Sequence, residues 1–251
     1  MQIRPGLIRA AVASACAAAA FAAVAAPTVY FGLDNSNLSG GGAAPNAAAA
    51  AAAFAAAAGP LATQNFDAMA LGAVPPNFGI GAVTAGFTSS ASDYVRVASG
   101  VGTFSTFAIS GAQYLEGLTL NGSGYFTISL DTPVSALGFY ITDASDWAGT
   151  GAQIPNLSVV LTQVSGTAAL DLMGGLDPAT VVDGNVAFFG VIDAANPITG
   201  FSIVNPAAVP DRDAIGLDNL QVSAVPVPGS AALLALGMLP LCAMRRRLQQ
   251  A

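Results

Sequence analysis

Short runs of alternating apolar and polar residues fill much of the chain after residue 64. In Phe126–Leu130 the residues Phe, Ile and Leu alternate with Thr and Ser. A period of two places one set of side chains on the buried face of a β-strand and the other set in solvent. Similar runs occupy residues 118–120, 157–162 and 201–203. We therefore expect about nine or ten strands between Phe66 and Val222.

Turn-forming residues bound these runs. The clearest turn sequences are Asn121–Gly124, Asp131–Pro133 and Asp183–Asn185. No segment after residue 60 has the 3.6-residue period of an amphipathic helix. Many short strands with frequent turns are typical of an antiparallel sandwich. The pattern predicts an all-β fold, an antiparallel β-sandwich of the jelly-roll type.

The region before residue 60 has a different pattern. Thr28–Gly42 is polar and rich in turn formers, which predicts a flexible lead. Pro45–Ala58 is nearly all alanine and ends at Gly59-Pro60, which predicts one short helix with Asn46 at its N-terminal cap. Because Phe54 is its only large apolar residue, we expect this helix to dock weakly.

The N-terminus has the pattern of a secretory signal peptide. Arg4 and Arg9 form a positive start, and Ala10–Ala26 is an uninterrupted run of small and apolar residues. Ala23 and Ala25 supply the small-x-small pattern that signal peptidase requires. Cleavage after Ala25 would remove residues 1–25.

The C-terminus has a short apolar run followed by a basic cluster. The run, Ala231–Met244, is shorter than the roughly 20 residues of an ordinary spanning helix, and Pro240 interrupts it. The basic cluster is typical of a cytoplasmic end. The motif before the run comprises Pro226, Val227, Pro228 and Gly229, and the cluster comprises Arg245, Arg246 and Arg247.

This order of motif, apolar helix and arginines resembles the tail of the bacterial PEP-CTERM proteins. Val227 stands where the family motif has Glu. The resemblance implies processing by an exosortase-like enzyme at the inner membrane, and residence at the cell surface or in the extracellular polysaccharide matrix of a biofilm. A plain C-terminal membrane anchor is the alternative interpretation of the same tail.

The resemblance extends less specifically into the body of the chain. Pro133–Asp143, Phe188–Val191 and Ile215–Leu220 look like recurring strands in the globular domains of these proteins. Those domains are lectin-like or carbohydrate-module-like sandwiches, so the resemblance implies the same architecture here.

The composition excludes several function classes. The chain has no His or Lys, its net charge is −7, and its two cysteines, Cys16 and Cys242, lie in the apolar ends. Between those ends the chain has fourteen acidic residues and two basic residues, Arg96 and Arg212. The resulting formal charge of −12 disfavours nucleic-acid binding. Triads based on His or Lys and zinc sites of the His/Cys kind cannot be built. A glycosidase needs only two carboxylates, so a secreted hydrolase is the remaining enzyme class.

Two sets of residues are candidates for ligand binding. Jelly-roll carbohydrate modules often hold a structural calcium ion between the first and last strands, where Asp67 and Asp218 would stand here. The alternative is that these aspartates end strands and turns without metal. Trp147, near Asp143 and Asp146, is the second candidate, because an indole can stack on a sugar ring. The alternative is a Trp packed on the rim of the sandwich.

These observations predict four segments: a signal peptide at 1–25, a flexible lead and helix at 26–60, a β-sandwich at 61–224, and a sorting or anchor tail with a single membrane helix at 225–251. We expect an exported, non-enzymatic protein of the cell surface or polysaccharide matrix. A carbohydrate-binding module and a secreted hydrolase are the alternative functions. The expected partners are signal peptidase, an exosortase-like enzyme, the inner membrane and extracellular polysaccharide.

The signal peptide gives the first testable prediction. Because Ala23 and Ala25 fit signal peptidase, exported protein should begin at Ala26. N-terminal sequencing of that material is the measurement, and Ala23→Arg with Ala25→Arg is the variant that should stay uncleaved. Exported protein that still carries Met1 would contradict the prediction.

Overall fold

The computed structural model describes residues 26–89, 94–118, 125–144, 157–172, 180–204 and 214–224. These residues form antiparallel strands, one α-helix and one short 3-10 turn. In chain order the elements are β1 (Thr28–Asp34), α2 (Pro45–Ala58), β2 (Ala62–Gln64), β3 (Gly72–Ala73), β4 (Asn77–Ile80), β5 (Val83–Thr88), β6 (Tyr94–Ser99), η1 (Thr103–Ser105), β7 (Gln113–Leu118), β8 (Phe126–Thr142), β9 (Ser158–Gln163), β10 (Gly166–Asp171), β11 (Val186–Ile192), β12 (Ile198–Val204) and β13 (Ala214–Ala224).

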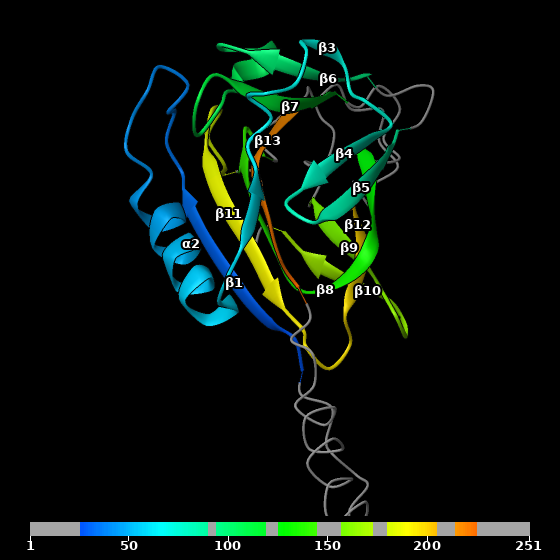
Figure 1. Ribbon diagram of the computed structural model, residues 1–251. Coiled ribbons are helices and arrows are strands. Elements are labelled where there is room, and N and C mark those ends of the chain that lie inside the picture. The colour runs from blue at the N-terminus through cyan, green and yellow to red at the C-terminus, as the bar shows by residue number, and fades with distance from the viewer. Residues whose placement is uncertain are drawn as a thin grey trace, which may run out of the picture.

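Strand β8 is 17 residues long and joins two groups of strands (Figure 1). Its first part, Phe126–Leu130, pairs with β12 on one side and β5 on the other. Its last part, Val134–Thr142, pairs with β11 and β13. The first group runs β4-β5-β8-β12-β9-β10, and the second runs β1-β11-β8-β13-β7-β6-β3, with β2 beside β13.

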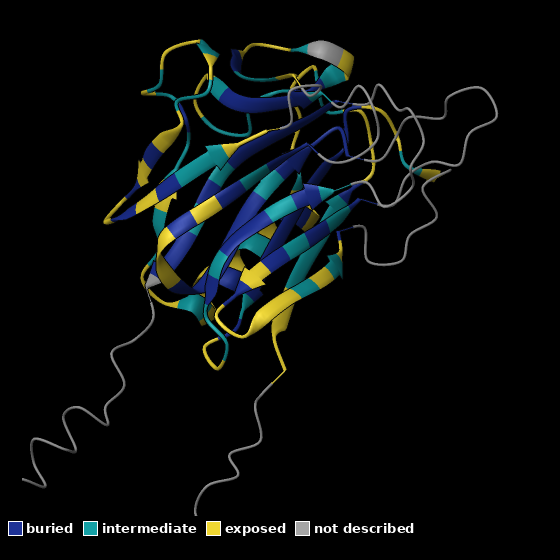
Figure 2. Ribbon diagram, turned by 90° about the vertical axis from the view of Figure 1, so that its right-hand side faces the viewer, coloured by how far each residue is buried: buried dark blue, intermediate teal, exposed yellow. Residues whose placement is uncertain are grey.

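The core lies between these two groups of strands. Phe139 of the second group stacks on Phe201 of the first, with ring centroids 5.1 Å apart, and also contacts Phe189 at 5.5 Å. Ile128 and Leu137, from the two parts of β8, are buried in the same apolar cluster. Figure 2 shows buried residues through the middle of the strands and many exposed residues at turns and at strand ends. The two groups therefore form the layers of one sandwich-like body.

The prediction of an antiparallel all-β fold with one helix is confirmed, because every pairing among the described residues is antiparallel. One boundary was wrong. Asp131–Pro133, predicted as a turn, lies inside β8. The register against β12 shifts here, so that Ile198 faces Val134 while Gly200 faces Ser129. The turn formers therefore make an exposed irregularity where β8 changes partners.

The predicted flexible lead was also wrong at its start. Thr28–Asp34 forms β1, which pairs with β11 along its whole length. The turn formers begin only at Asp34, and the residues before them are mostly β-branched, aromatic or apolar. Two of these, Phe31 and Leu33, pack against the core. The sheet therefore includes a strand that lies before residue 61.

Helix α2 forms where the alanine run predicts it, but a different residue caps it. The side chain of Asn46 makes no cap; Asp34, at the end of β1, accepts hydrogen bonds from the backbone N–H groups of Asn46 at 3.2 Å and Ala47 at 2.9 Å. A carboxylate at this position satisfies free N–H groups and opposes the positive end of the helix dipole. The cap thus ties the helix to the sheet.

Phe54 fixes α2 against the outer face of the sheet, and the expectation of weak docking was wrong. The ring is fully buried between Gly138 and Gly190, which pair directly across β8 and β11. A Cβ atom at Gly138 or Gly190 would lie 2.8 or 2.7 Å from the ring. Phe188 and Tyr30 contact its other sides, with centroids 5.6 and 5.8 Å away. Two glycines therefore make a hollow that a single large side chain fills.

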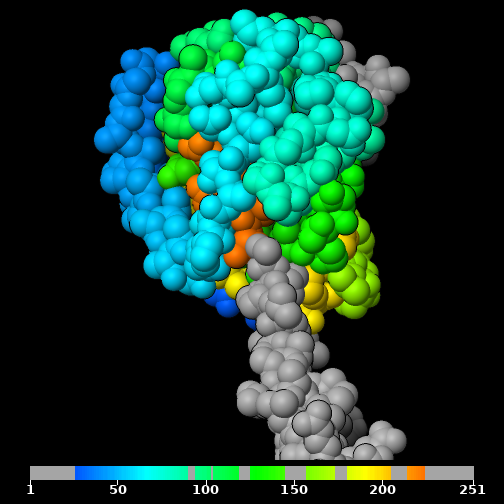
Figure 3. Space-filling model, in the orientation of Figure 1, coloured from blue at the N-terminus to red at the C-terminus, as the bar shows by residue number. Residues whose placement is uncertain are grey.

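Both ends of the described body lie at one end of the sandwich. Thr28 pairs with Ile192, Ile192 with Ala136, and Ala136 with Ser223. Three strand spacings of about 4.8 Å place Thr28 about 14 Å from Ser223. Figure 1 shows this end at the bottom, with β3, β6 and β7 at the top. On the face of the molecule shown in Figure 3, the segment after α2 covers part of β13.

Within the described ranges, no helix has the length and apolarity needed to cross a membrane. The predicted signal peptide and its cleavage residues Ala23 and Ala25 lie outside those ranges. So does the whole tail, residues 225–251. Their predictions therefore rest on the sequence.

The hollow around Phe54 generates a stability prediction. Phe54→Ala should lower the free energy of unfolding by about 3–5 kcal/mol, because it leaves a cavity between two glycines that cannot fill it. Phe104→Ala is the matched control, since it makes the same truncation at an exposed residue. Chemical denaturation measures both. Equal losses for the two variants would show that the hollow is not a stabilising contact.

Candidate functional site

The polar cluster of the structure lies on the outer face of β6, β7 and the segment that joins them. On β6, Val95 and Val97 pack toward the core, so Tyr94 and Arg96 alternate to the outer face. Arg96 pairs directly with Glu116 of β7 in the register. A cross-strand pair of opposite charge is therefore set by the strand alignment alone.

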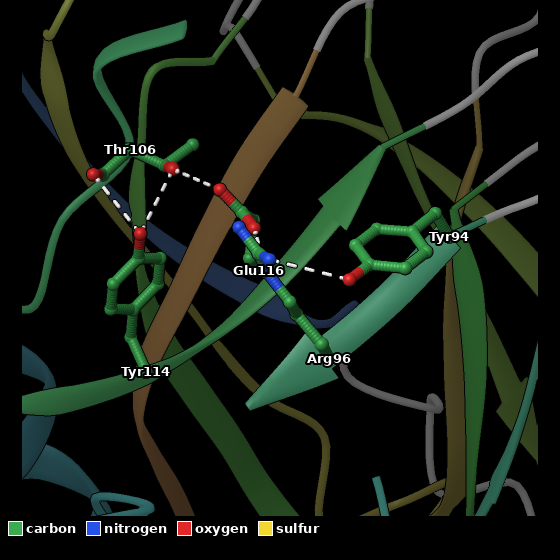
Figure 4. Close-up of polar contacts among 5 residues, drawn as sticks. All are labelled: Tyr94, Arg96, Thr106, Tyr114 and Glu116. Carbon is green, nitrogen blue, oxygen red and sulfur yellow. Dashed lines mark hydrogen bonds and ion pairs between the residues drawn. The ribbon is translucent and has the colours of Figure 1, made fainter. Parts of the chain in front are cut away.

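Glu116 is the buried centre of this cluster (Figure 4). It is 1% exposed, and one carboxylate oxygen forms an ion pair with Nε of Arg96 at 2.5 Å. The other oxygen accepts a hydrogen bond from the hydroxyl of Thr106 at 2.9 Å. A buried carboxylate is tolerated when its charge is paired and its oxygens are hydrogen-bonded. Arg96 and Thr106 provide both conditions.

Arg96 is the only basic side chain among the residues that the structure describes. Its Nη1 donates to the hydroxyl of Tyr94 at 3.3 Å, and its guanidinium carbon lies 5.3 Å from the centre of the Tyr94 ring. Burial lowers the pKa of Arg96, but hydrogen bonding and charge from Glu116 outweigh it and raise the pKa overall. Arg96 thus links the buried carboxylate to a half-exposed aromatic ring.

Tyr114 completes the buried side of the cluster. Its hydroxyl donates to the carbonyl of Thr106 at 3.1 Å and lies 3.1 Å from the Thr106 hydroxyl. Burial raises the pKa of Tyr114. A Cβ atom at Gly102 would overlap Tyr114, Glu116 and Thr106, so the chain reaches this close only because residue 102 is glycine.

The segment of residues 100–112, which we call the covering loop, lies against the carboxylate of Glu116 through Gly102 and Thr106. Asp218 accepts the backbone N–H groups of Ile109 and Ser110, each at 2.9 Å. Asp67 accepts those of Ala112 and Gln113, at 2.8 and 2.9 Å. The two aspartates proposed for calcium therefore do converge, but they converge on this loop and hold it by its backbone.

These surroundings do not suit a cation. One oxygen of Asp218 accepts two N–H groups and the other accepts the N–H of Asn219 at 2.6 Å. The remaining oxygen of Asp67 accepts the side-chain amide of Asn65 at 2.9 Å. Calcium requires oxygen ligands, and here the carboxylates face hydrogen-bond donors. No group of three or more His, Cys, Asp or Glu in the described ranges could hold a metal. Calcium at these two residues stays a prediction of the sequence that the local chemistry disfavours.

The other predicted ligand group is only partly described. Asp143 is buried with a positive φ of 61°, and its carboxylate accepts the N–H of Gly184 at 2.7 Å. Asp146 and Trp147 lie outside the described residues, so sugar stacking by Trp147 stays a prediction. Within its described surroundings, Asp143 holds the turn before β11.

Sequence reasoning missed the Tyr94, Arg96 and Glu116 cluster. Two signals were present: Arg96 is one of two arginines between the apolar ends, and Glu116 is the only glutamate. A rare charged residue inside a predicted strand needs a partner of opposite charge. Arg96 and Glu116 could have been paired on that ground.

No protein-family model matches the chain, and no curated protein matches it. Among solved structures, the chain is similar to the K2 cleaved adhesin domain of Lys-gingipain, with 14% identity and a TM-score of 0.41. The match covers 65% of this chain and 97% of that chain. At this identity and score, it carries no conclusion about function.

Asp218 generates a prediction of pH dependence. Burial raises its pKa from 3.8 to about 6; N–H groups from Ser110, Asn219 and Ile109 oppose that shift, and the charge of Asp67 adds to it. Between pH 4 and 6 the folded protein therefore holds a proton that the unfolded chain has lost. The free energy of unfolding should fall as pH rises through this window, by up to about 3 kcal/mol from this residue.

Asp218→Asn should remove that part of the pH dependence, because the amide does not titrate. Asp171→Asn is the control, since it removes one acid from an exposed position at the end of β10. Urea denaturation at pH 4, 5, 6 and 7 measures the difference between each variant and the parent. A parent-like pH profile in Asp218→Asn would rule out the raised pKa.

Proposed function

We propose that this chain is an exported, tail-sorted, non-enzymatic protein of the bacterial cell surface or extracellular polysaccharide matrix, with a jelly-roll sandwich as its body. The observation that carries the proposal is the tail itself: Pro226–Gly229, a short apolar run and Arg245–Arg247 at the end. Signal peptidase acts first in this scheme. The tail then holds an inner-membrane-anchored precursor until an exosortase-like enzyme processes it.

The arrangement of the body supports this proposal. Its first strand begins and its last strand ends at the same end of the sandwich, about 14 Å apart by strand spacing. The row of residues that contains Arg96 lies at the other end: Thr142 is in register with Gly216, Gly216 with Glu116, and Glu116 with Arg96. Six residues of β8 separate the rows, or about 20 Å. A tail at one end would present the other end to the matrix.

The contacts of the acidic residues support a non-enzymatic role. Glu116 is ion-paired and hydrogen-bonded, while Asp67 and Asp218 accept backbone N–H groups. A general acid or base needs to reach substrate, and these three carboxylates instead hold the covering loop and Arg96. The secreted hydrolase is therefore the weaker alternative. A carbohydrate-binding module is the stronger one, because a half-exposed Tyr94 beside Arg96 suits a polar ligand with an apolar face.

The tail is tested by replacing Arg245, Arg246 and Arg247 with Ser. Without the basic cluster the apolar run should lose its orientation signal, so we expect less of the precursor in the inner membrane and altered processing. Membrane fractionation and intact mass are the measurements. Gln249→Ser with Gln250→Ser is the matched control, because it changes polar residues just beyond the cluster. Unchanged location and mass in the arginine variant would contradict the proposal.

A further inference from the structure

A shallow hollow of about 270 Å³ lies beside Tyr94 and Arg96 on β6. Its lining residues come from β6 and from the start of β3: Leu71, Gly72, Tyr94, Arg96, Val97, Ala98 and Ser99. Ligand pockets for drug-sized molecules have roughly 300–1,000 Å³, so this hollow suits one small ring. A Cβ atom at Gly72 would meet no atom within 4 Å, so the hollow is open on that side.

The lining has an apolar part and a hydrogen-bonding part. Leu71 and Tyr94 are 59% and 49% exposed, although both are large and apolar in body. Arg96 has five N–H groups, of which one binds Glu116 and one binds Tyr94. No hydrogen bond from the other three N–H groups to a described residue is present, and the ion pair with buried Glu116 restrains the guanidinium that carries them. An exposed aromatic ring beside a held guanidinium recognises a molecule that has both an apolar face and hydroxyl groups.

Charge decides between neutral and acidic ligands. The positive charge of Arg96 is already paired with Glu116. The chain around it has a net charge of −7, which repels an anionic polymer over a distance of several ångströms. The hydroxyl groups of a neutral ligand can accept hydrogen bonds from the remaining N–H groups of Arg96 without that repulsion. The hollow therefore favours an uncharged sugar ring over a uronate or a phosphate.

We propose that the hollow formed by Leu71, Tyr94, Arg96 and Ser99 binds a neutral pyranose ring of a polysaccharide. The C–H face of the sugar packs on Tyr94 and Leu71, and its hydroxyls accept hydrogen bonds from Arg96. This site deepens the proposed function, on which it rests for its setting at the cell surface or matrix. None of these four residues belongs to the group predicted around Trp147.

The test uses the full chain, purified in a detergent that has no sugar headgroup. The probes are tetramers of β-1,4-linked glucose, β-1,4-linked mannose and α-1,4-linked galacturonate, and saturation-transfer NMR reads binding. We expect at least one neutral tetramer to bind and the galacturonate tetramer to bind at least tenfold more weakly. Tyr94→Ala should weaken neutral binding at least tenfold. Val164→Ala, which trims an exposed apolar residue between β9 and β10 and outside the hollow, should leave binding unchanged.

Arg96→Lys is the second variant, because Lys keeps the charge next to Glu116 but lacks the planar fork. It should weaken binding while thermal unfolding shows that the protein is folded. The proposal fails if no neutral tetramer binds, if Tyr94→Ala binds as the parent does, or if galacturonate binds more tightly than the neutral tetramers. The location of the Arg245–Arg247 variant tests the proposed function separately, since it does not depend on Tyr94.

Discussion

The structure depends on β8, which pairs with four strands and belongs to both layers. Its first part pairs with β5 and β12 and its last part with β11 and β13. The two layers therefore share one continuous backbone, and side chains from both parts of that strand meet in one core. Successive side chains of β8 lie on opposite faces of the sheet, and this alternation also positions the other elements. Phe139 points inward to stack on Phe201, while its neighbour Gly138 leaves room for the Phe54 ring of α2 on the outer face.

Carboxylates also hold the backbone at several places in the fold. In a chain without Lys or His, acidic residues have few cationic partners, and many of them bind backbone N–H groups instead. Asp34 caps α2, Asp131 accepts the N–H of Thr84 at 2.9 Å, and Asp193 accepts that of Asn196 at 2.9 Å. Hydrogen bonds to an ionised acceptor are stronger than neutral ones. The acids that suggested metal or catalysis in the sequence thus have a structural use.

The sequence predicted elements whose signal is local and missed those that depend on distant partners. Alternation over Phe126–Leu130 and the alanine run of α2 have one local interpretation, and both elements form. The turn formers Asp131–Pro133 look the same whether they end a strand or bulge within one; only the partners β11 and β12 decide. The cap on α2 from Asp34 and the pairing of Arg96 with Glu116 join residues 12 to 20 positions apart. Their alignment is a property of the sheet, which no single segment reveals.

A continuous chain of contacts links Asp67 and Asp218, which hold the covering loop, to the sugar-binding hollow. Asp218 and Asp67 hold the backbone of the covering loop, and Thr106 of that loop donates a hydrogen bond to buried Glu116. Burial removes Glu116 from water, which strengthens its attraction for Arg96. Arg96 has its guanidinium fixed at one end by that ion pair and at the other by the hydroxyl and ring of Tyr94. A binding group that is already held in place loses little conformational freedom when a ligand arrives. The acidic residues therefore contribute to recognition without touching the ligand, because they determine where the guanidinium donors of Arg96 point.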